Sequence, residues 1–151
     1  MAKSPKSSQE QSLCHCTALR KASRRVSQMY DQALAPSGLR TTQRAILGQL
    51  RRSGVLSVSA LAAALVKEAN GFTNTLKPLE RDGLVRVKPD PADRRGRLVS
   101  LTVAGNRKLR ETDALWAAAQ ARFEAAMGRL ESATLRANLV ALATDEFTEV
   151  L

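Results

Sequence analysis

One stretch of the chain, residues 84–105, combines two alternating segments with a turn-rich centre. Apolar side chains alternate with polar or charged ones on both sides of that centre, at Val85, Val87, Val99 and Leu101. A period of two predicts two antiparallel strands. The centre, residues 89–97, holds two prolines and a glycine. Because proline lacks the N–H that a strand ladder needs, we expect neither strand to continue through it.

The predicted hairpin carries three arginines at or near its tip: Arg94, Arg95 and Arg97. A narrow cationic hairpin suits the backbone or a narrow groove of a nucleic acid. A solvated surface hairpin is the alternative, because charged side chains are ordinarily exposed.

The distribution of charge supports a polyanionic partner. The 151 residues carry a net charge of +10, and residues 40–105 alone contribute +7. Residues 106–151 sum to −1, which suits a protein–protein surface better than a DNA surface. This length predicts one domain, or one domain with an appended dimerisation element.

No apolar run is long enough to span a membrane, and the first residues lack the apolar centre of a signal peptide. We interpret residues 1–8 as a disordered basic lead-in. With two cysteines and no export signal, the chain is expected in a bacterial-type cytoplasm, without a membrane partner.

The spacing of apolar residues predicts helices over 8–34, 42–52, 60–66 and 68–81, with a short strand-like segment at 55–58. Thr41 or Thr42 is expected to cap the second helix, and Ser59 the third. Helix, short helix, longer helix and hairpin in this order predict a winged helix-turn-helix, so the fold class is mainly α with a small β-hairpin. The winged unit is expected over residues 39–105.

The helix over residues 68–81 is the predicted recognition helix. Its apolar face is Phe72, Leu76 and Leu79. Its polar face carries the residues expected to contact double-stranded DNA in the major groove: Asn70, Thr73, Asn74 and Lys77. Asparagine pairs with adenine, threonine meets a thymine methyl, and lysine contacts guanine or a phosphate. An ordinary solvated helix face is the alternative.

A long helix is predicted from Val103 to Met127 or Leu130. Large side chains recur every seven residues, at Leu109, Trp116, Phe123 and Leu130. Core packing within one chain explains this row as well as dimer packing does, but the winged unit is complete without the helix, which favours a dimer. A last helix is expected to start at Ser132 or Thr134, with Leu135, Leu139, Leu142 and Phe147 on one side. Residues 9–38 and 106–151 would then form a helical dimerisation region.

These residues resemble the MarR family of transcriptional regulators (multiple-antibiotic-resistance regulator type). The resemblance rests on Asp93-x-Arg95 followed by Leu101-Thr102-x-x-Gly105, with Leu79-Glu80-Arg81-Asp82-Gly83-Leu84-Val85 before it. It implies that Arg95 enters the minor groove and that Asp93 positions it. It also implies a homodimer on a pseudo-palindromic operator, released by a small molecule or an oxidant. The family usually opens its recognition helix with Asp-Arg and then Thr, whereas this chain has Glu68, Ala69 and Gly71.

By the same resemblance, the effector would bind where the dimer helices meet the winged unit. The candidate effector residues are Cys16, Arg20, Tyr30 and Arg44, and an anionic aromatic compound would suit the arginines. We expect no cofactor.

Cys14 and Cys16 flank the only histidine, His15. On one helix, residues two apart point about 200° away from each other, so neither a shared metal ion nor a disulfide fits within that helix. A redox role is the better hypothesis, because the segment from Cys16 to Arg24 resembles the organic-hydroperoxide-sensing branch of the family. That branch has a tyrosine where this chain has Arg20. A buried, inert Cys16 is the alternative.

No catalytic constellation is present, so an enzyme is not expected. The leading hypothesis is a homodimeric, effector-released regulator that acts as a repressor. A thiol-based redox regulator using Cys16 and a sequence-indifferent architectural DNA-binding protein are the alternatives.

Overall fold

The computed structural model describes residues 14–65 and 69–149, except for the side chains of residues 69–71 and 148. The predicted lead-in over residues 1–8 lies outside the described residues. The helices are α1 (His15–Leu34), α2 (Thr41–Ser53), α3 (Val58–Ala64), α4 (Ala69–Arg81), α5 (Val103–Glu111), α6 (Asp113–Met127), α7 (Arg129–Leu142) and α8 (Asp145–Glu149), with a 3₁₀ turn η1 (Ala35–Ser37) after α1. The strands are β1 (Leu56–Ser57), β2 (Val85–Asp90) and β3 (Asp93–Leu101).

The wing is a three-stranded antiparallel sheet with the strand order β1-β3-β2. The strand-like segment near Leu56 therefore joins the predicted hairpin. The expectation that neither strand continues through residues 89–97 was wrong, because β2 runs to Asp90, β3 begins at Asp93, and Pro89 pairs with Arg97. Proline is tolerated there because β2 is an edge strand, and the register shifts between Pro89 and Asp90.

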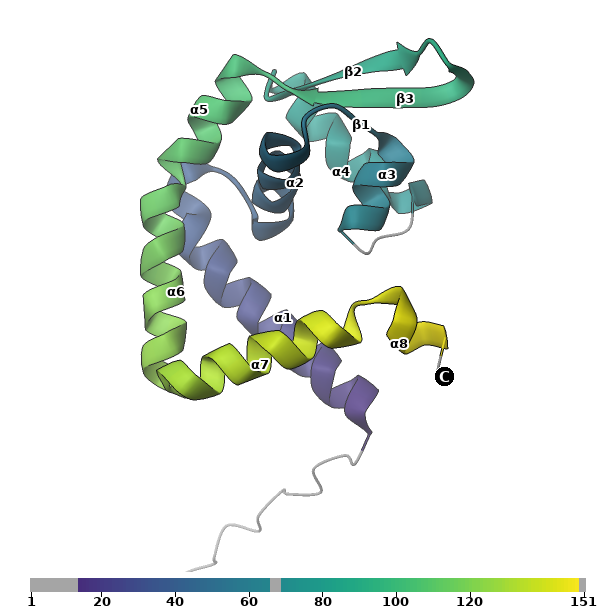
Figure 1. The fold of residues 1–151 in the computed structure, drawn as a ribbon. Helices are drawn as coiled ribbons and strands as arrows, with labels where there is room; N and C mark the ends of the chain where they lie inside the picture. Colours follow the sequence, from purple (N-terminus) through teal and green to yellow (C-terminus); the bar gives the residue numbers. More distant parts are fainter. Residues whose placement is uncertain (1–13, 66–68, 150–151) are drawn as a thin grey trace, which may run out of the picture.

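The hydrophobic core lies in the winged unit. It joins the apolar faces of α2, α3 and α4 to the sheet and to the start of α5, and its fully buried members include Ile46, Leu47, Leu61, Leu79, Val99 and Leu109. The predicted inward face of the recognition helix is confirmed, since Phe72, Leu76 and Leu79 are buried. This core fixes α4 beside the wing (Figure 1).

The ends of three helices differ from the prediction. Ser57, not Ser59, caps α3, because its Oγ accepts a hydrogen bond from the N–H of Ala60 at 3.1 Å. The N-cap of α2 is Arg40 and not a threonine: the side chain of Gln43 accepts a bond from the N–H of Arg40 at 3.0 Å, and the carboxylate of Asp31 in α1 accepts bonds from Thr41, the first residue of α2. α1 begins at His15, and residues 8–13 of the predicted helix lie outside the described residues.

The predicted long helix is broken at Thr112 into α5 and α6. The buried hydroxyl of Thr112 donates to the carbonyl of Leu109 at 2.6 Å and accepts from Arg44, which holds Thr112 as the cap residue between α5 and α6. Within the chain, the first members of the row of large residues spaced by seven pack internally, whereas the last one, Leu130, is exposed. Leu109 lies in the winged core, and Trp116 packs against Tyr30 of α1.

Helices α1, α6 and α7 form a second layer below the winged unit, with α7 crossing α1 (Figure 1). The predicted last helix is two helices, and α7 starts earlier than expected, directly after Gly128, whose φ is +92°. In α7 only Ser132 is buried, and Leu139, Leu142 and Phe147 of the predicted apolar side are exposed. Within the described residues, no helix is long and apolar enough to cross a membrane.

Candidate nucleic-acid interface

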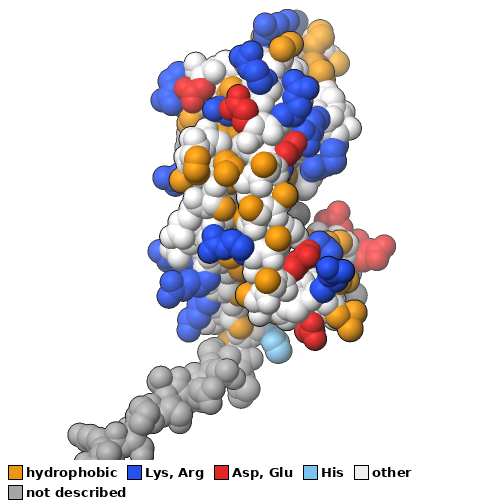
Figure 2. Space-filling view, turned by 90° about the vertical axis from the view of Figure 1, so that its left-hand side faces the viewer, with side chains coloured by type: hydrophobic (Ala, Val, Ile, Leu, Met, Phe, Trp, Pro, Cys, Tyr) orange, Lys and Arg blue, Asp and Glu red, His pale blue; other side chains and the backbone are white. Residues whose placement is uncertain are grey.

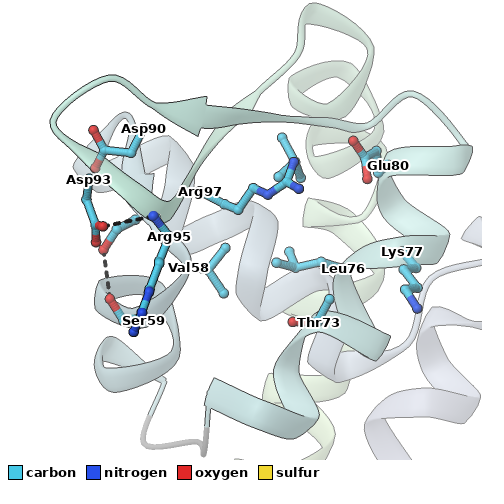
Figure 3. Close-up of a pocket in the computed structure, with 13 residues that line it drawn as sticks. Val58, Ser59, Thr73, Leu76, Lys77, Glu80, Asp90, Asp93, Arg95 and Arg97 are labelled. Carbon is cyan, nitrogen blue, oxygen red and sulfur yellow. Dashed lines mark hydrogen bonds between the residues drawn. The ribbon is translucent and has the colours of Figure 1, made fainter.

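A cleft of about 640 Å³ separates the wing from α4 and the start of α3. Arg95 and Arg97 of β3 and Thr73 and Lys77 of α4 line this cleft, and Thr73 faces the wing in Figure 3. The structure therefore brings together four of the residues predicted to contact DNA, from segments about 20 residues apart in the chain. A cleft between a helix and a hairpin that carries Lys77, Arg95 and Arg97 can bind the phosphates of a polyanion.

Two aspartates shape the turn at the tip of the wing. Asp93 Oδ1 accepts a hydrogen bond from the backbone N–H of Arg95 at 2.9 Å, and Asp90 Oδ1 accepts one from Ala92 at 2.8 Å. A Cβ at Gly96 would lie 3.1 Å from the Cβ atoms of both aspartates, so the turn is tight. Asp93 thus holds the backbone of Arg95, while the guanidinium group stays available to a ligand.

None of the wing arginines forms an ion pair with another described residue. Arg94 is exposed at the tip and does not line the cleft, whereas Arg95 and Arg97 do. The carboxylates that share the cleft are Glu80, Asp90 and Asp93. Lys and Arg side chains also gather at the upper end of the α5–α6 face, toward the sheet (Figure 2). This end of the molecule therefore offers a positive surface to an anionic partner.

On α4, Thr73, Asn74 and Lys77 are exposed on the face opposite the buried Phe72 and Leu76. Asn74 lies outside the cleft lining. Asn70 lies within α4, but its side chain is among those that the structure does not describe.

Sequence reasoning missed Ser57, Ser59 and Glu80 as members of the cleft. The hydroxyls of Ser57 and Ser59 lie 3.1 Å apart beside Arg95 (Figure 3). The available signal was the Ser-x-Ser pair in front of an Ala-rich helix, in which Ser57 was predicted as part of a strand-like segment and Ser59 as a helix cap. Hydroxyls at this place can bind a phosphate oxygen.

The four candidate effector residues do not share a cavity among the described residues. Cys16 and Arg20 are exposed near the start of α1. Tyr30 lines a cavity of about 290 Å³ between α1, α6 and α7, together with Gln120 and Arg136. Arg44 is engaged elsewhere, with Thr112, Asp113 and Trp116.

The cysteine pair has a geometry that we did not expect. Cys14 is the N-cap of α1 and has an extended backbone, with φ −76° and ψ 110°, so the two cysteines are not on one helix. The helical argument against a link between them therefore does not hold. Both thiols are exposed, and hydrogen bonds from the hydroxyl and backbone of Thr17 lower the pKa of Cys14. No group of three or more His, Cys, Asp or Glu among the described residues is placed to hold a metal ion.

Comparison with known proteins identifies this architecture. A sequence model of the MarR family matches residues 37–96, which include every residue that lines the cleft except Arg97. The chain is 34% identical to the transcriptional regulator MosR of M. tuberculosis, whose crystal structure is a complex with DNA. The alignment covers 91% of this chain and 99% of MosR, with a TM-score of 0.80. The chain belongs to the MarR family.

Other relatives agree with MarR-family membership. The repressor CouR, solved on a 23-mer DNA duplex, is 26% identical, with a TM-score of 0.78 over 87% of this chain and 93% of CouR. The transcriptional activatory protein BadR of Rhodopseudomonas palustris is 43% identical over 77 residues. That match spans 49% of this chain but only 44% of BadR. The chain is therefore a DNA-binding transcriptional regulator of the MarR family, and its relatives are regulators and not enzymes, as predicted.

Proposed function

We propose that this MarR-family regulator is a homodimeric repressor that binds a pseudo-palindromic operator and leaves it when a small molecule binds. The observation that carries the proposal is the cleft between α4 and the wing, into which Lys77, Arg95 and Arg97 project without ion pairs among the described residues. When such cations contact phosphates, they displace counterions condensed on the nucleic acid, and the release of these counterions favours binding. Because it acts on DNA, the protein is expected to work in the bacterial cytoplasm.

In this proposal α4 lies in the major groove and the wing contacts the flanking DNA. The base-contacting residues are Asn70, Thr73, Asn74 and Lys77, and the wing residues are Arg94, Arg95 and Arg97. Asp93 positions the wing, since it bonds the backbone of Arg95. Ser57 and Ser59, which also line the cleft, add hydrogen bonds to the phosphate backbone of the DNA.

The homodimer is supported by exposed apolar side chains in the helical layer, the layer formed by α1, α6 and α7. Leu130 and Val140 of α7 are 75% and 62% exposed, and Leu19 of α1 is 42% exposed. Most of α1 before Val26 is exposed as well, so no other residue in the described ranges 14–65 and 69–149 covers these faces of α1 and α7. A second copy that packs its own terminal helices there, over residues 9–38 and 106–151, would bury them. Val140→Glu is expected to yield monomers by analytical ultracentrifugation, whereas the substitution of the exposed Thr73 by Ala is expected to leave dimers.

The cavity between α1, α6 and α7 is the best effector site that the structure offers. Its walls are largely apolar, from Val26, Phe123 and Leu135, and its polar groups are Tyr30 and Arg136 together with Gln120 and Ser132. A volume of about 290 Å³ suits one aromatic ring with a carboxylate near Arg136. Such a ligand would release DNA only if it prefers a different spacing of the two recognition helices. Calorimetry with benzoate, on the wild type and Arg136→Gln, tests this site.

A redox regulator is the second candidate, and the exposed Cys14 with its lowered pKa favours it. The thiolate would attack an organic hydroperoxide, take one oxygen as sulfenic acid and release the alcohol. Cys16 is the cysteine that the family resemblance designates for the same role. Loss of the hydroperoxide response in Cys14→Ser or Cys16→Ser, with the benzoate response retained, would identify the switch as oxidation.

Footprinting on the DNA upstream of the protein's own gene tests the main proposal. We expect protection of two half-sites about one helical turn apart. Protection without sequence preference, with all competitor DNA equally effective at matched salt, would instead indicate an architectural protein. A reporter that falls when the protein is added, and rises when the operator is mutated, would establish repression.

A further inference from the structure

One arginine ties the winged unit to the helical layer. Arg44 belongs to α2, and its side chain crosses to the junction between α5 and α6. Its Nε donates to Thr112 Oγ1 at 2.9 Å and its Nη2 to Asp113 Oδ1 at 3.0 Å. Its Cζ lies 4.3 Å from the centre of the Trp116 ring. The guanidinium group is thus held by a hydroxyl, a carboxylate and an aromatic face.

Helix α1 reaches the same place with two consecutive residues. The ring of Tyr30 lies 4.5 Å from that of Trp116, and the hydroxyl of Tyr30 hydrogen-bonds Gln120 of α6. The next residue, Asp31, accepts bonds from the N–H and the hydroxyl of Thr41, at 2.7 Å and 2.6 Å. Thr41 stands one turn before Arg44, so α1, α2 and α6 are fixed to one another at one point.

The contacts of Arg44 restrict the orientation of its side chain. The side chain of Arg44 is only 15% exposed, and burial lowers its pKa while Asp113 opposes that shift. A guanidinium group is planar, and donors in a fixed fork fit few orientations of their acceptors. One of its acceptors is constrained as well, because the Thr112 hydroxyl is buried and bonded to Leu109. The Asp113 side chain is 47% exposed, so the ion pair itself is expected to add little stability, whereas the orientation of Arg44 follows directly from its contacts.

We infer that Arg44 is a positioning residue, which sets the angle between the winged unit and the helical layer. The inference rests on the proposed homodimer. If the helical layers of two copies join, this angle determines the distance and rotation between the two α4 helices. Arg44 would then select the spacing of the operator half-sites without touching DNA.

The test uses operator spacing, which a merely structural residue would not change. Operator duplexes are first selected from a random pool by the wild-type protein, and one base pair is then inserted or removed between the half-sites. Each base pair changes the separation by about 3.4 Å and the rotation by about 35°. We expect wild-type affinity to fall about tenfold for either change. For Arg44→Gln, the same insertion or removal should lower affinity by less than about threefold, because a less constrained angle between the winged unit and the helical layer tolerates several half-site spacings.

Two controls separate this effect from damage. Arg51→Gln alters an exposed arginine of α2 that also pairs with Asp113, at 3.7 Å, and it should keep the wild-type preference. Affinity for a single half-site duplex should be equal in the wild type and Arg44→Gln. The only tryptophan, Trp116, should change its fluorescence in Arg44→Gln, which reports the lost contact.

Arg44→Lys keeps the charge but cannot bond Thr112 and Asp113 in the same fork, so it should also lose the preference. It also serves if Arg44→Gln does not fold, as judged by circular dichroism. A folded variant at Arg44 that retains the full wild-type preference overturns the inference and leaves the proposed function standing. A wild-type protein that selects no paired half-sites overturns the proposed function, and this inference with it.

Discussion

Replacing Arg95 with alanine tests whether the wing contributes to DNA affinity through its charge. In each copy four proposed contact residues are cationic: Lys77, Arg94, Arg95 and Arg97. Eight such contacts in a dimer give a slope of log affinity against log salt of about −7. Affinity should then fall by about four orders of magnitude between 50 and 200 mM salt. Because Arg95→Ala removes two contacts, the slope should flatten to about −5, with a fall of about three orders.

The assay is fluorescence anisotropy on the selected operator duplex at four or five salt concentrations. Arg129→Ala is the matched control, because Arg129 is also exposed but lies at the α6–α7 corner, at the opposite end from the wing (Figure 1). The control should keep the wild-type slope, and both variants should keep the wild-type oligomeric state. An unchanged slope and affinity in Arg95→Ala would refute the assignment of this wing residue.

Three further expectations concern single residues. Burial raises the pKa of Tyr30, the only tyrosine, so the contribution of Tyr30 to stability is present below pH about 10 and is lost as the pH rises through the pKa of the folded state. Ultraviolet titration should therefore give a higher pKa for the folded protein than for the denatured chain. Gly105→Ala places a Cβ 2.0 Å from the carbonyl oxygen of Leu84, and should lower the free energy of unfolding by about 2 kcal/mol in urea titrations. Because its pKa is lowered, Cys14 should react with iodoacetamide at a lower pH than a free cysteine, and mass spectrometry of Cys14→Ser should show that early labelling gone.

Local patterns in the sequence predicted the elements well but not how far they extend. Alternation located both long strands, and four-and-three spacing located the buried face of α4 at Phe72 and Leu76. Pro89 was wrongly expected to end its strand, because tolerance of proline depends on which edge of the sheet is free. That edge is set by pairing of Leu56 with Val99, a contact across about 40 residues that no local pattern contains.

Contacts between residues distant in the sequence also explain which site residues could be predicted and which could not. The Asp93 and Arg95 pair is local, and the structure places both residues at the tip of the wing. Ser57 and Ser59 were missed because only the folded sheet brings them to Arg95. The break at Thr112 was also missed; the Thr112 hydroxyl bonds Leu109 nearby in the chain, but it also accepts a bond from Arg44, which comes from α2. Sequence reasoning had assigned Arg44 and Tyr30 to one effector site, whereas the structure places Trp116 between them.

The distribution of burial connects the proposed dimer to regulation. The winged unit has its own continuous core, whereas in the helical layer α7 buries only Ser132. Exposed faces of α1 and α7 would be covered by the proposed second copy, and the cavity beside Tyr30 lies between α1, α6 and α7. A ligand in that cavity would act on the part of the molecule whose packing is least determined by its own chain. The winged units, with their own cores, would move as rigid bodies, so a small change between α1 and α7 would reach DNA as altered spacing.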